Sequence, residues 1–382
     1  MATIVERFLA WAQGAPVARR REAASALARS FLFSPLITEE RDQVEAAMTV
    51  LLDDPAIEVR LALAEILAAS EQAPHHLILG LAADKDAVAA LVAEKSPLLL
   101  DSELVDMLAE RGEPVQAAIA RRPYVSRALS AAVAEVAAAA ACEALVTNPG
   151  ARVLRFSLDR MVARHGDCPE LRLALLERED LPLETRQVLL ASLAGSLREL
   201  IVDHAWMPPE RAAALTQDAR EWATIHAAFE APAESVPALV RELMQEQALT
   251  PSFLIRAVAS GQTAIFGAAL ATLAKVPQTR VNSLIASGRA ANLQALLETS
   301  TLPKRTFPAF AAAIEVIRTG DSLTGASSDY RRATQLIDAI VTRYQGRPDR
   351  ELDSILALLR RFAADAKRSA ARDYAQQMRD AA

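Results

Sequence analysis

The hydrophobic and polar positions of this 382-residue chain recur in units of similar length. Each unit has a leucine-led helix end, a polar corner, and a second apolar helix that begins roughly five to eight residues later. Five such segments start at residues 51, 81, 108, 145 and 175, so successive starts are 30, 27, 37 and 30 residues apart. A period near 30 residues without strand patterns predicts stacked helical hairpins.

The first of these segments, LLDDPAIEVRLALAEILAAS at 51–70, shows how one unit is built. Its second helix carries apolar side chains on more than one face, which suits a helix packed between neighbours. We predict that Asp54 caps the helix that Pro55 starts, because an aspartate and a proline are favoured at these positions. Arg60 is expected to reach a neighbouring corner. The third unit is drawn out by an alanine run, ALSAAVAEVAAAAACEAL.

The pattern changes after about residue 205 and then resumes. Segments starting at 254 and 284 are again 30 residues apart, with Gly261 and Gly288 at their corners. The tail carries two apolar stripes joined by Gly-Arg-Pro, which predicts a terminal helical hairpin that caps the array. The predicted regions are therefore an N-terminal repeat region at 1–205, a second helical region at 206–325, and a C-terminal hairpin at 326–382.

Composition supports a helical fold and sets limits on function. Only 12 glycines occur, and alanine and leucine dominate, so we predict an all-α protein. The net charge of -6 disfavours nucleic acid as the general partner, because nucleic-acid-binding proteins usually present a basic face. Residues 331–382 are different, since they hold eleven Arg and Lys against seven Asp and Glu.

The sequence predicts a cytoplasmic location for the chain. Two cysteines, Cys142 and Cys168, are too few for a disulfide scaffold and form no metal-ligand spacing. The first residues lack the basic lead and cleavage site of an export signal. Residues 257–274 carry no charge, but Gly261, Gln262 and Thr263 divide them into halves too short to cross a bilayer, so no membrane span is expected.

Several ordered strings resemble the alphaproteobacterial domain of unknown function 2336 over roughly residues 45–320. They are DPAIEVRLALAEIL at 54–67, SPLLLDSEL at 96–104, AIARR at 118–122, LVTNPGARV at 145–153, EREDLP at 177–182 and LIRAVASGQTAIFGAALATLA at 254–274. The resemblance implies a HEAT-like helical repeat fold, an α-solenoid of stacked hairpins, in bacterial cytoplasm. It supplies no established activity and no catalytic residues to transfer.

Candidate chemistry is sparse, and we predict no catalytic, cofactor-binding or metal site. Asp53 and Asp54 are adjacent and tend to diverge on a corner, so a structural role is favoured over metal or phosphate binding. The loop containing His165, Asp167 and Cys168 lacks a further nearby donor for zinc. His226 is a candidate phosphoacceptor, although a lone helical histidine is usually ordinary. Nucleotide-binding, acyl-transfer and zinc-hydrolase motifs are absent from the sequence.

The predicted function is therefore interaction. We expect a non-enzymatic adaptor or scaffold that binds a protein or peptide through a groove built by the repeats, in a role such as bacterial signalling. The alternative is a DNA-binding protein or DNA glycosylase relative that acts through the region of Arg121 and Arg122, with Arg19, Arg20 and Arg21 as a second basic cluster. The candidate partner-binding residues are Arg121, Arg122, Tyr124, Arg155 and Arg160.

Overall fold

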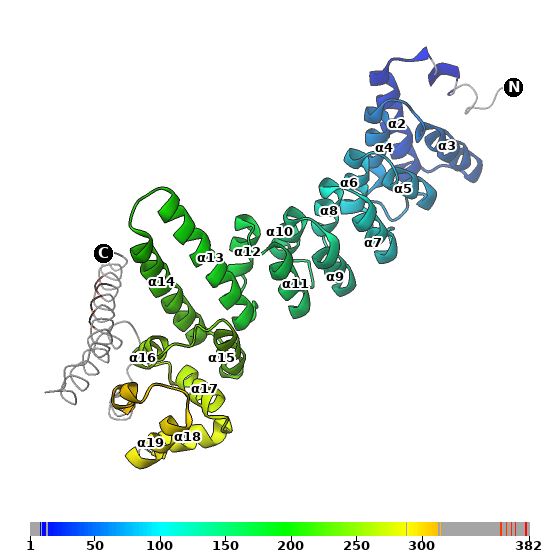
Figure 1. Ribbon diagram of the computed structural model, residues 1–382. Helices are drawn as coiled ribbons and strands as arrows, with labels where there is room; N and C mark the ends of the chain where they lie inside the picture. Colours follow the sequence, from blue (N-terminus) through cyan, green and yellow to red (C-terminus); the bar gives the residue numbers. More distant parts are fainter. Residues whose placement is uncertain are drawn as a thin grey trace. The chain divides into compact units, whose positions relative to one another are not determined.

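The computed structural model describes residues 8, 10–12, 14–287, 289–311 and 314, with isolated positions at 360, 364, 368, 371 and 379. Within these residues all regular structure is helical, which confirms the predicted all-α class (Figure 1). The exception to helices and turns there is one isolated parallel bridge between Val125 and Ala151. The predicted hairpin at 326–382 and the corner at Gly288 lie outside the described residues.

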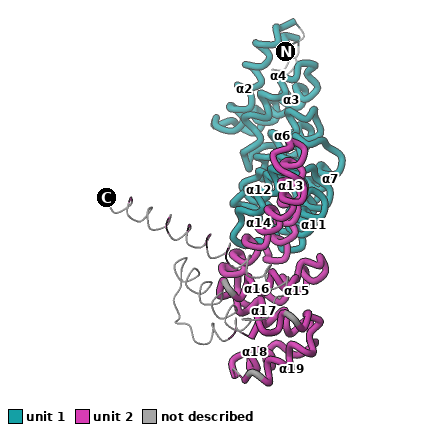
Figure 2. Tube along the Cα trace, turned by 60° about the vertical axis from the view of Figure 1, so that its left-hand side comes forward, with its two compact units in different colours: residues 1–181 teal, residues 182–382 magenta. Residues whose placement is uncertain are grey.

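Contacts divide the chain into two compact units, residues 1–181 and 182–382 (Figure 2). The helices of the first unit are α2 (Val17–Phe33), α3 (Thr38–Leu51), α4 (Ile57–Leu67), α5 (His75–Ala82), α6 (Asp86–Lys95), α7 (Asp101–Glu110), α8 (Glu113–Ala120), α9 (Arg127–Val136), α10 (Ala139–Thr147), α11 (Arg155–His165) and α12 (Pro169–Leu176). The predicted regions 1–205, 206–325 and 326–382 divide the chain differently and remain predictions.

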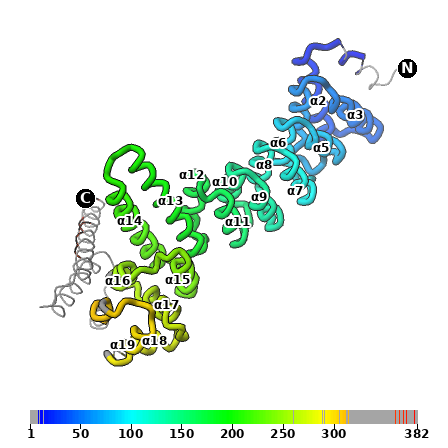
Figure 3. Tube along the Cα trace, viewed as in Figure 1, coloured from blue at the N-terminus to red at the C-terminus, as the bar shows by residue number. Residues whose placement is uncertain are grey.

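The helices of the first unit pack in two rows. In one row each of α2, α4, α6, α8, α10 and α12 contacts the next, and in the other α7 contacts α9 and α9 contacts α11. Figure 3 shows that helices follow one another in sequence order along this unit. The inner helices of the first row are therefore held between two neighbours, which explains why α4 buries Ala62 and Ala64 as well as Leu63, on more than one face.

Two boundaries differ from the sequence prediction. Helix α4 begins at Ile57 with Ala56 at its N-cap, so Asp54 does not occupy the N-cap position and Pro55 lies before the helix. The alanine run is broken at Ala137 and Ala138, whose extended backbone separates α9 from α10. The amide of Ala138 donates to Oε1 of Gln116 at 2.9 Å, so a side chain from α8 holds this break in place.

The second unit begins with a long helical hairpin. Its helices are α13 (Leu183–Asp203), α14 (Pro209–Glu230), α15 (Val236–Gln245), α16 (Pro251–Ala259), α17 (Thr263–Ala274), α18 (Gln278–Ser287) and α19 (Ala290–Thr299), with 3-10 turns at Ala233–Ser235 and Lys304–Thr306. Helix α13 packs on α14 and α15, and α17 packs on α15, α16, α18 and α19. Phe266 of α17 stacks on Phe310 at 5.3 Å between ring centroids.

The uncharged stretch 257–274 is cut by a turn, as the sequence predicted. Gly261 lies between α16 and α17 with a φ of 89°. An L side chain rarely adopts this conformation, so a glycine is favoured at this corner. No helix in the described part of the chain is long and apolar enough to cross a membrane.

Candidate interaction site

The acidic corner after α3 is occupied by an internal ion pair. Asp54 accepts hydrogen bonds from Nε of Arg20 at 2.7 Å and from Nη2 of the same guanidinium at 3.0 Å. Its Oδ1 also accepts the amide of Ala56 at 2.9 Å. Asp54 is buried, whereas its neighbour Asp53 is exposed. The two carboxylates therefore diverge, and the corner joins α2 to the start of α4.

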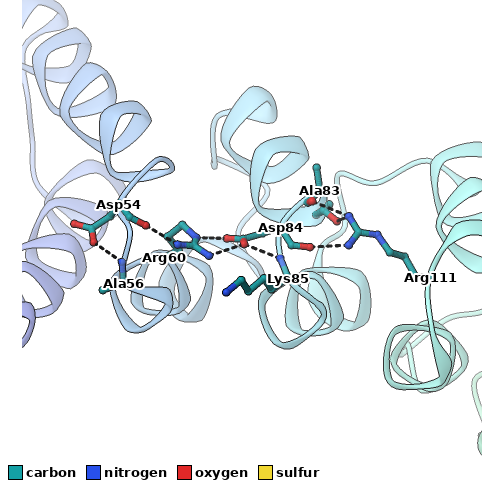
Figure 4. A network of polar contacts seen from close by, with 8 residues as sticks. Asp54, Ala56, Arg60, Ala83, Asp84, Lys85 and Arg111 are labelled. Carbon is teal, nitrogen blue, oxygen red and sulfur yellow. Dashed lines mark hydrogen bonds and ion pairs between the residues drawn. The ribbon is translucent and has the colours of Figure 1, made fainter.

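Arg60 extends this network to the next corner (Figure 4). Its guanidinium donates to the main-chain oxygen of Asp54, and also to Oδ2 and Oδ1 of Asp84 at 2.5 and 2.8 Å. Arg111 then donates to the main-chain oxygens of Ala83 and Asp84, both at 2.7 Å. Three consecutive corners are thus joined by charge-assisted hydrogen bonds, which are stronger than neutral ones.

These contacts change the acidity of the corner carboxylates. Burial opposes the ionisation of Asp54, but hydrogen bonds from Arg20 and from the Ala56 amide outweigh it and lower the pKa of Asp54. The pKa of Asp84 is lowered in the same way, since burial is outweighed by Arg60 and by the Lys85 amide. Both groups are therefore held as carboxylates.

A second set of side chains caps helix ends along the row of even-numbered helices. Arg122, just after α8, donates to the main-chain oxygens of Ala93 and Ser96 at the end of α6. Asn148, just after α10, donates to the main-chain oxygens of Ala120 and Arg122 at 2.8 and 2.7 Å.

Arg178, just after α12, continues the series by donating to the oxygen of Val146 at 2.8 Å. We call Arg122, Asn148 and Arg178 the corner ladder. Each of them satisfies carbonyls that the preceding helix of the row leaves without an intrahelical partner. The sequence pattern did not identify the ladder as such, although a polar residue one or two positions after each helix was the available signal.

The five predicted partner-binding residues therefore have different surroundings. Arg122 is half-buried, and burial lowers the pKa of its guanidinium although Asp101 lies nearby. Its terminal nitrogens are engaged with main-chain oxygens of the unit. Arg121 is exposed and pairs with Glu94 at 3.5 Å. Arg160 pairs with Glu135 of α9 through two contacts at 2.7 and 2.9 Å.

Tyr124 lies where two corners meet. The amide of Val125 donates to the oxygen of Gly150 at 3.2 Å, and the amide of Arg152 donates to the oxygen of Val125 at 3.0 Å. A Cβ at Gly150 would lie 2.0 Å from the main-chain oxygen of Pro123, so only glycine permits this approach. Arg152 consequently lies 6.0 Å from the Tyr124 ring centroid, at the outer limit of a cation–π contact.

Exposed apolar side chains gather at the N-terminal ends of α7, α9 and α11. Tyr124 is 59% exposed and Phe156 is 57% exposed, and Leu100 is exposed at the start of α7. The Ser126 hydroxyl donates to Oδ2 of Asp101 at 2.5 Å, so the starts of α7 and α9 are also adjacent.

The basic side chains at these helix starts belong to Arg127, Arg152 and Arg155. Within the described residues, Arg155 pairs with Asp159 at 3.7 Å, and no carboxylate pairs with Arg127 or Arg152. We call Leu100, Tyr124, Arg127, Arg152 and Phe156 the corner surface. Sequence reasoning singled out Tyr124 from this set and missed Leu100, Arg152 and Phe156.

The remaining candidates for chemistry are dispersed. His165 lies within 3.1 Å of the Ala137 oxygen, and Cys168 donates to Glu170 at 3.3 Å. Across the described residues, no group of three or more His, Cys, Asp or Glu side chains comes together as a metal site would require. Nδ1 of His226 lies 3.9 Å from Oε1 of Glu230, and the ring centroids of His226 and Trp222 are 5.2 Å apart.

Comparison with known protein families identifies the family of the chain. Residues 88–350 match the family described as "Uncharacterised protein conserved in bacteria (DUF2336)". This match covers more than half of the chain, which therefore belongs to the DUF2336 family. No curated protein and no solved structure matches it.

Proposed function

We propose that this chain is a non-enzymatic adaptor or regulatory scaffold of the bacterial cytoplasm, and that its first unit is a HEAT-like α-solenoid. The two rows of helices in residues 1–181 support the repeat interpretation, because repeat stacks place the ends of successive helices side by side. Such stacks offer extended surfaces whose side chains can vary without disturbing the core. A role in bacterial signalling is part of the proposal.

The corner surface carries the proposal. Tyr124 and Phe156 are both more than half exposed, although aromatic side chains of this size are usually buried. Aromatic residues with adjacent arginines are enriched at protein-binding hot spots. The guanidinium groups of Arg127 and Arg152, which pair with no carboxylate among the described residues, favour an acidic peptide that also carries apolar anchors.

The same geometry ranks DNA binding below peptide binding. Of the basic candidates for a DNA contact, Arg20, Arg121 and Arg122 are engaged within the unit, with Asp54, Glu94 and main-chain oxygens respectively. Arg19 pairs with Glu22, and Arg21 is exposed. Arg127 and Arg152 remain available for phosphate contact, but two arginines beside apolar side chains are fewer than the several basic contacts that DNA-backbone binding usually uses. DNA binding is therefore kept as an outcome of the test.

Site-specific photo-crosslinking in the native bacterium tests the proposal. A photoreactive phenylalanine analogue at position 124 or 156 should capture the same protein partner reproducibly. The matched control is position 136, because Val136 is exposed at the opposite end of α9. Arg127→Ala combined with Arg152→Ala should weaken capture at position 124 by about tenfold, as expected for the loss of two contacts worth about 1.4 kcal/mol together.

Two results would overturn the adaptor assignment. One is identical crosslinking from positions 124, 156 and 136. The other is salt-sensitive retention of DNA that disappears in the Arg127→Ala, Arg152→Ala variant without any protein crosslink.

A further inference from the structure

The hairpin of α13 and α14 exposes an apolar line that the corner surface does not involve. Leu215, Trp222 and Phe229 follow one another at seven-residue intervals on α14, so they lie on one face of the helix. They are 51%, 54% and 50% exposed. Other faces of α14 are buried through Ala212, Thr216, Ile225 and Ala228. We call Leu215, Trp222 and Phe229 the α14 ridge.

The ridge has the composition of a binding surface. Single exposed apolar side chains are common, but a row containing tryptophan and phenylalanine indicates a contact with another helix or chain. The hairpin around it is acidic, since residues 182–235 hold eight Asp and Glu against four Arg. A basic amphipathic helix would therefore suit it.

The C-terminal part of this chain has such a sequence. Leu352, Ile355, Leu359 and Phe362 follow the three-and-four spacing of a helix that packs along a single seam. Residues 352–372, which contain this seam, hold five Arg and Lys against two Asp, and their net charge of +3 is opposite in sign to the -4 of the hairpin.

Described positions in this segment agree with the pattern. Arg360, Ala364, Arg368 and Ala371 are helical and exposed. At 100° per residue they fall on the face opposite the apolar one. The seam from 352 to 362 spans about 15 Å and the α14 ridge about 21 Å, at 1.5 Å per residue, so the lengths are compatible.

We propose that the segment 352–372 docks along the α14 ridge of the same chain. A second copy of the hairpin is a poorer occupant, because two surfaces of net charge -4 repel each other. The connection is long enough, since the roughly 38 residues from 314 to 352 reach up to about 125 Å when extended. The inference does not depend on the corner surface.

Fluorescence quenching of Trp222 in the full-length chain tests the docking. Trp11→Phe and Trp206→Phe leave Trp222 as the single tryptophan. Ile355→Asp with Leu359→Asp should release the segment and raise the acrylamide quenching constant by about twofold or more, because that constant follows the undocked population. The matched control is Ala364→Asp with Ala371→Asp, which adds the same charge to the opposite face and should leave quenching unchanged.

A synthetic peptide of residues 352–372 provides a second measurement. Added to the Ile355→Asp, Leu359→Asp variant, it should restore the protection of Trp222 with saturable dependence on concentration. Equal quenching in the parent, the variant and the control would overturn the proposal. Protection that rises with protein concentration together with a doubled molecular mass would also overturn it, in favour of a second copy.

Discussion

At the residue scale, adjacent side chains with the same chemistry have separate roles. Asp53 faces solvent, whereas Asp54 is buried against Arg20. A similar contrast holds for Arg121 and Arg122, since the first is exposed and the second is engaged with main-chain oxygens. Neighbouring positions in this chain therefore supply matched pairs in which one substitution tests structure and the other serves as its control.

Asp54→Ala should destabilise the protein by about 2–3 kcal/mol, because it leaves the guanidinium of Arg20 without its carboxylate in a site where both are largely buried. Urea unfolding of the purified chain measures this change. Asp53→Ala is the control and should stay within about 0.5 kcal/mol of the parent. Equal effects of the two substitutions would contradict the structural role of Asp54.

Stability should also depend on pH through Asp84. Its pKa is lowered in the folded protein, so the unfolded chain binds more protons and stability falls as the pH drops. The contribution is complete above the unfolded pKa of about 3.9 and is lost below it, as the pH falls through the folded value. Asp84→Asn should therefore flatten the decline of the unfolding free energy below about pH 4. If the unfolding free energy of Asp84→Asn, measured by urea titration, falls with pH as steeply as that of the parent, Asp84 is not a source of the pH dependence.

The two cysteines should differ in reactivity. Burial raises the pKa of the Cys142 thiol to about 11, whereas Cys168 is partly exposed at the start of α12. Because the thiolate is the reactive form, iodoacetamide at neutral pH should label Cys168 in the folded protein and Cys142 only after unfolding. Mass spectrometry of the Cys168→Ser variant provides the check, since rapid labelling of its native state would contradict the expected burial.

At the scale of helices, the corner ladder links one helix to the next in its row. Arg122→Ala should cost about 2 kcal/mol, because it leaves main-chain oxygens of Ala93 and Ser96 without their donor in a partly buried site. Arg121→Ala, its neighbour, should change the unfolding free energy by less than about 0.5 kcal/mol. Urea unfolding followed by circular dichroism compares the two variants. A larger loss of stability in Arg121→Ala than in Arg122→Ala would contradict the capping role of Arg122.

Sequence periodicity could predict the helices but not every boundary between them. The spacing of apolar residues correctly indicated an all-helical chain, and Gly261 marked its turn. The break at Ala137 and Ala138 gave no such signal, because alanine favours helix and the break depends on Gln116 of α8. A contact from 22 residues away decides this boundary.

The candidate site was predictable only in part for the same reason. Tyr124 could be chosen as an aromatic residue in a basic corner. Its neighbours Arg152 and Phe156 join it through the bridge between Val125 and Ala151, a tertiary contact that depends on Gly150. The capping role of Arg122 likewise depends on carbonyls that are 26 and 29 residues away.

At the scale of the whole molecule, each of the two units has a core of its own and should report its own unfolding. Labelling of Cys142 reports the unfolding of residues 1–181, and the fluorescence of Trp222 in a single-tryptophan variant reports the unfolding of residues 182–382. Arg122→Ala should lower the urea midpoint measured by labelling and leave the fluorescence midpoint unchanged. Equal shifts in both midpoints would show that the units unfold together.

The corner ladder also affects how freely the sequence can vary. Its acceptors are main-chain oxygens, which every amino acid supplies, so Ala93, Ala120 and Val146 can be exchanged for residues of similar size without loss of the contact. The donor position alone requires a particular kind of side chain. After α8, α10 and α12, one side chain therefore specifies the junction with the preceding helix of the row. A designer who lengthens the array by duplicating one of these units must preserve that residue first.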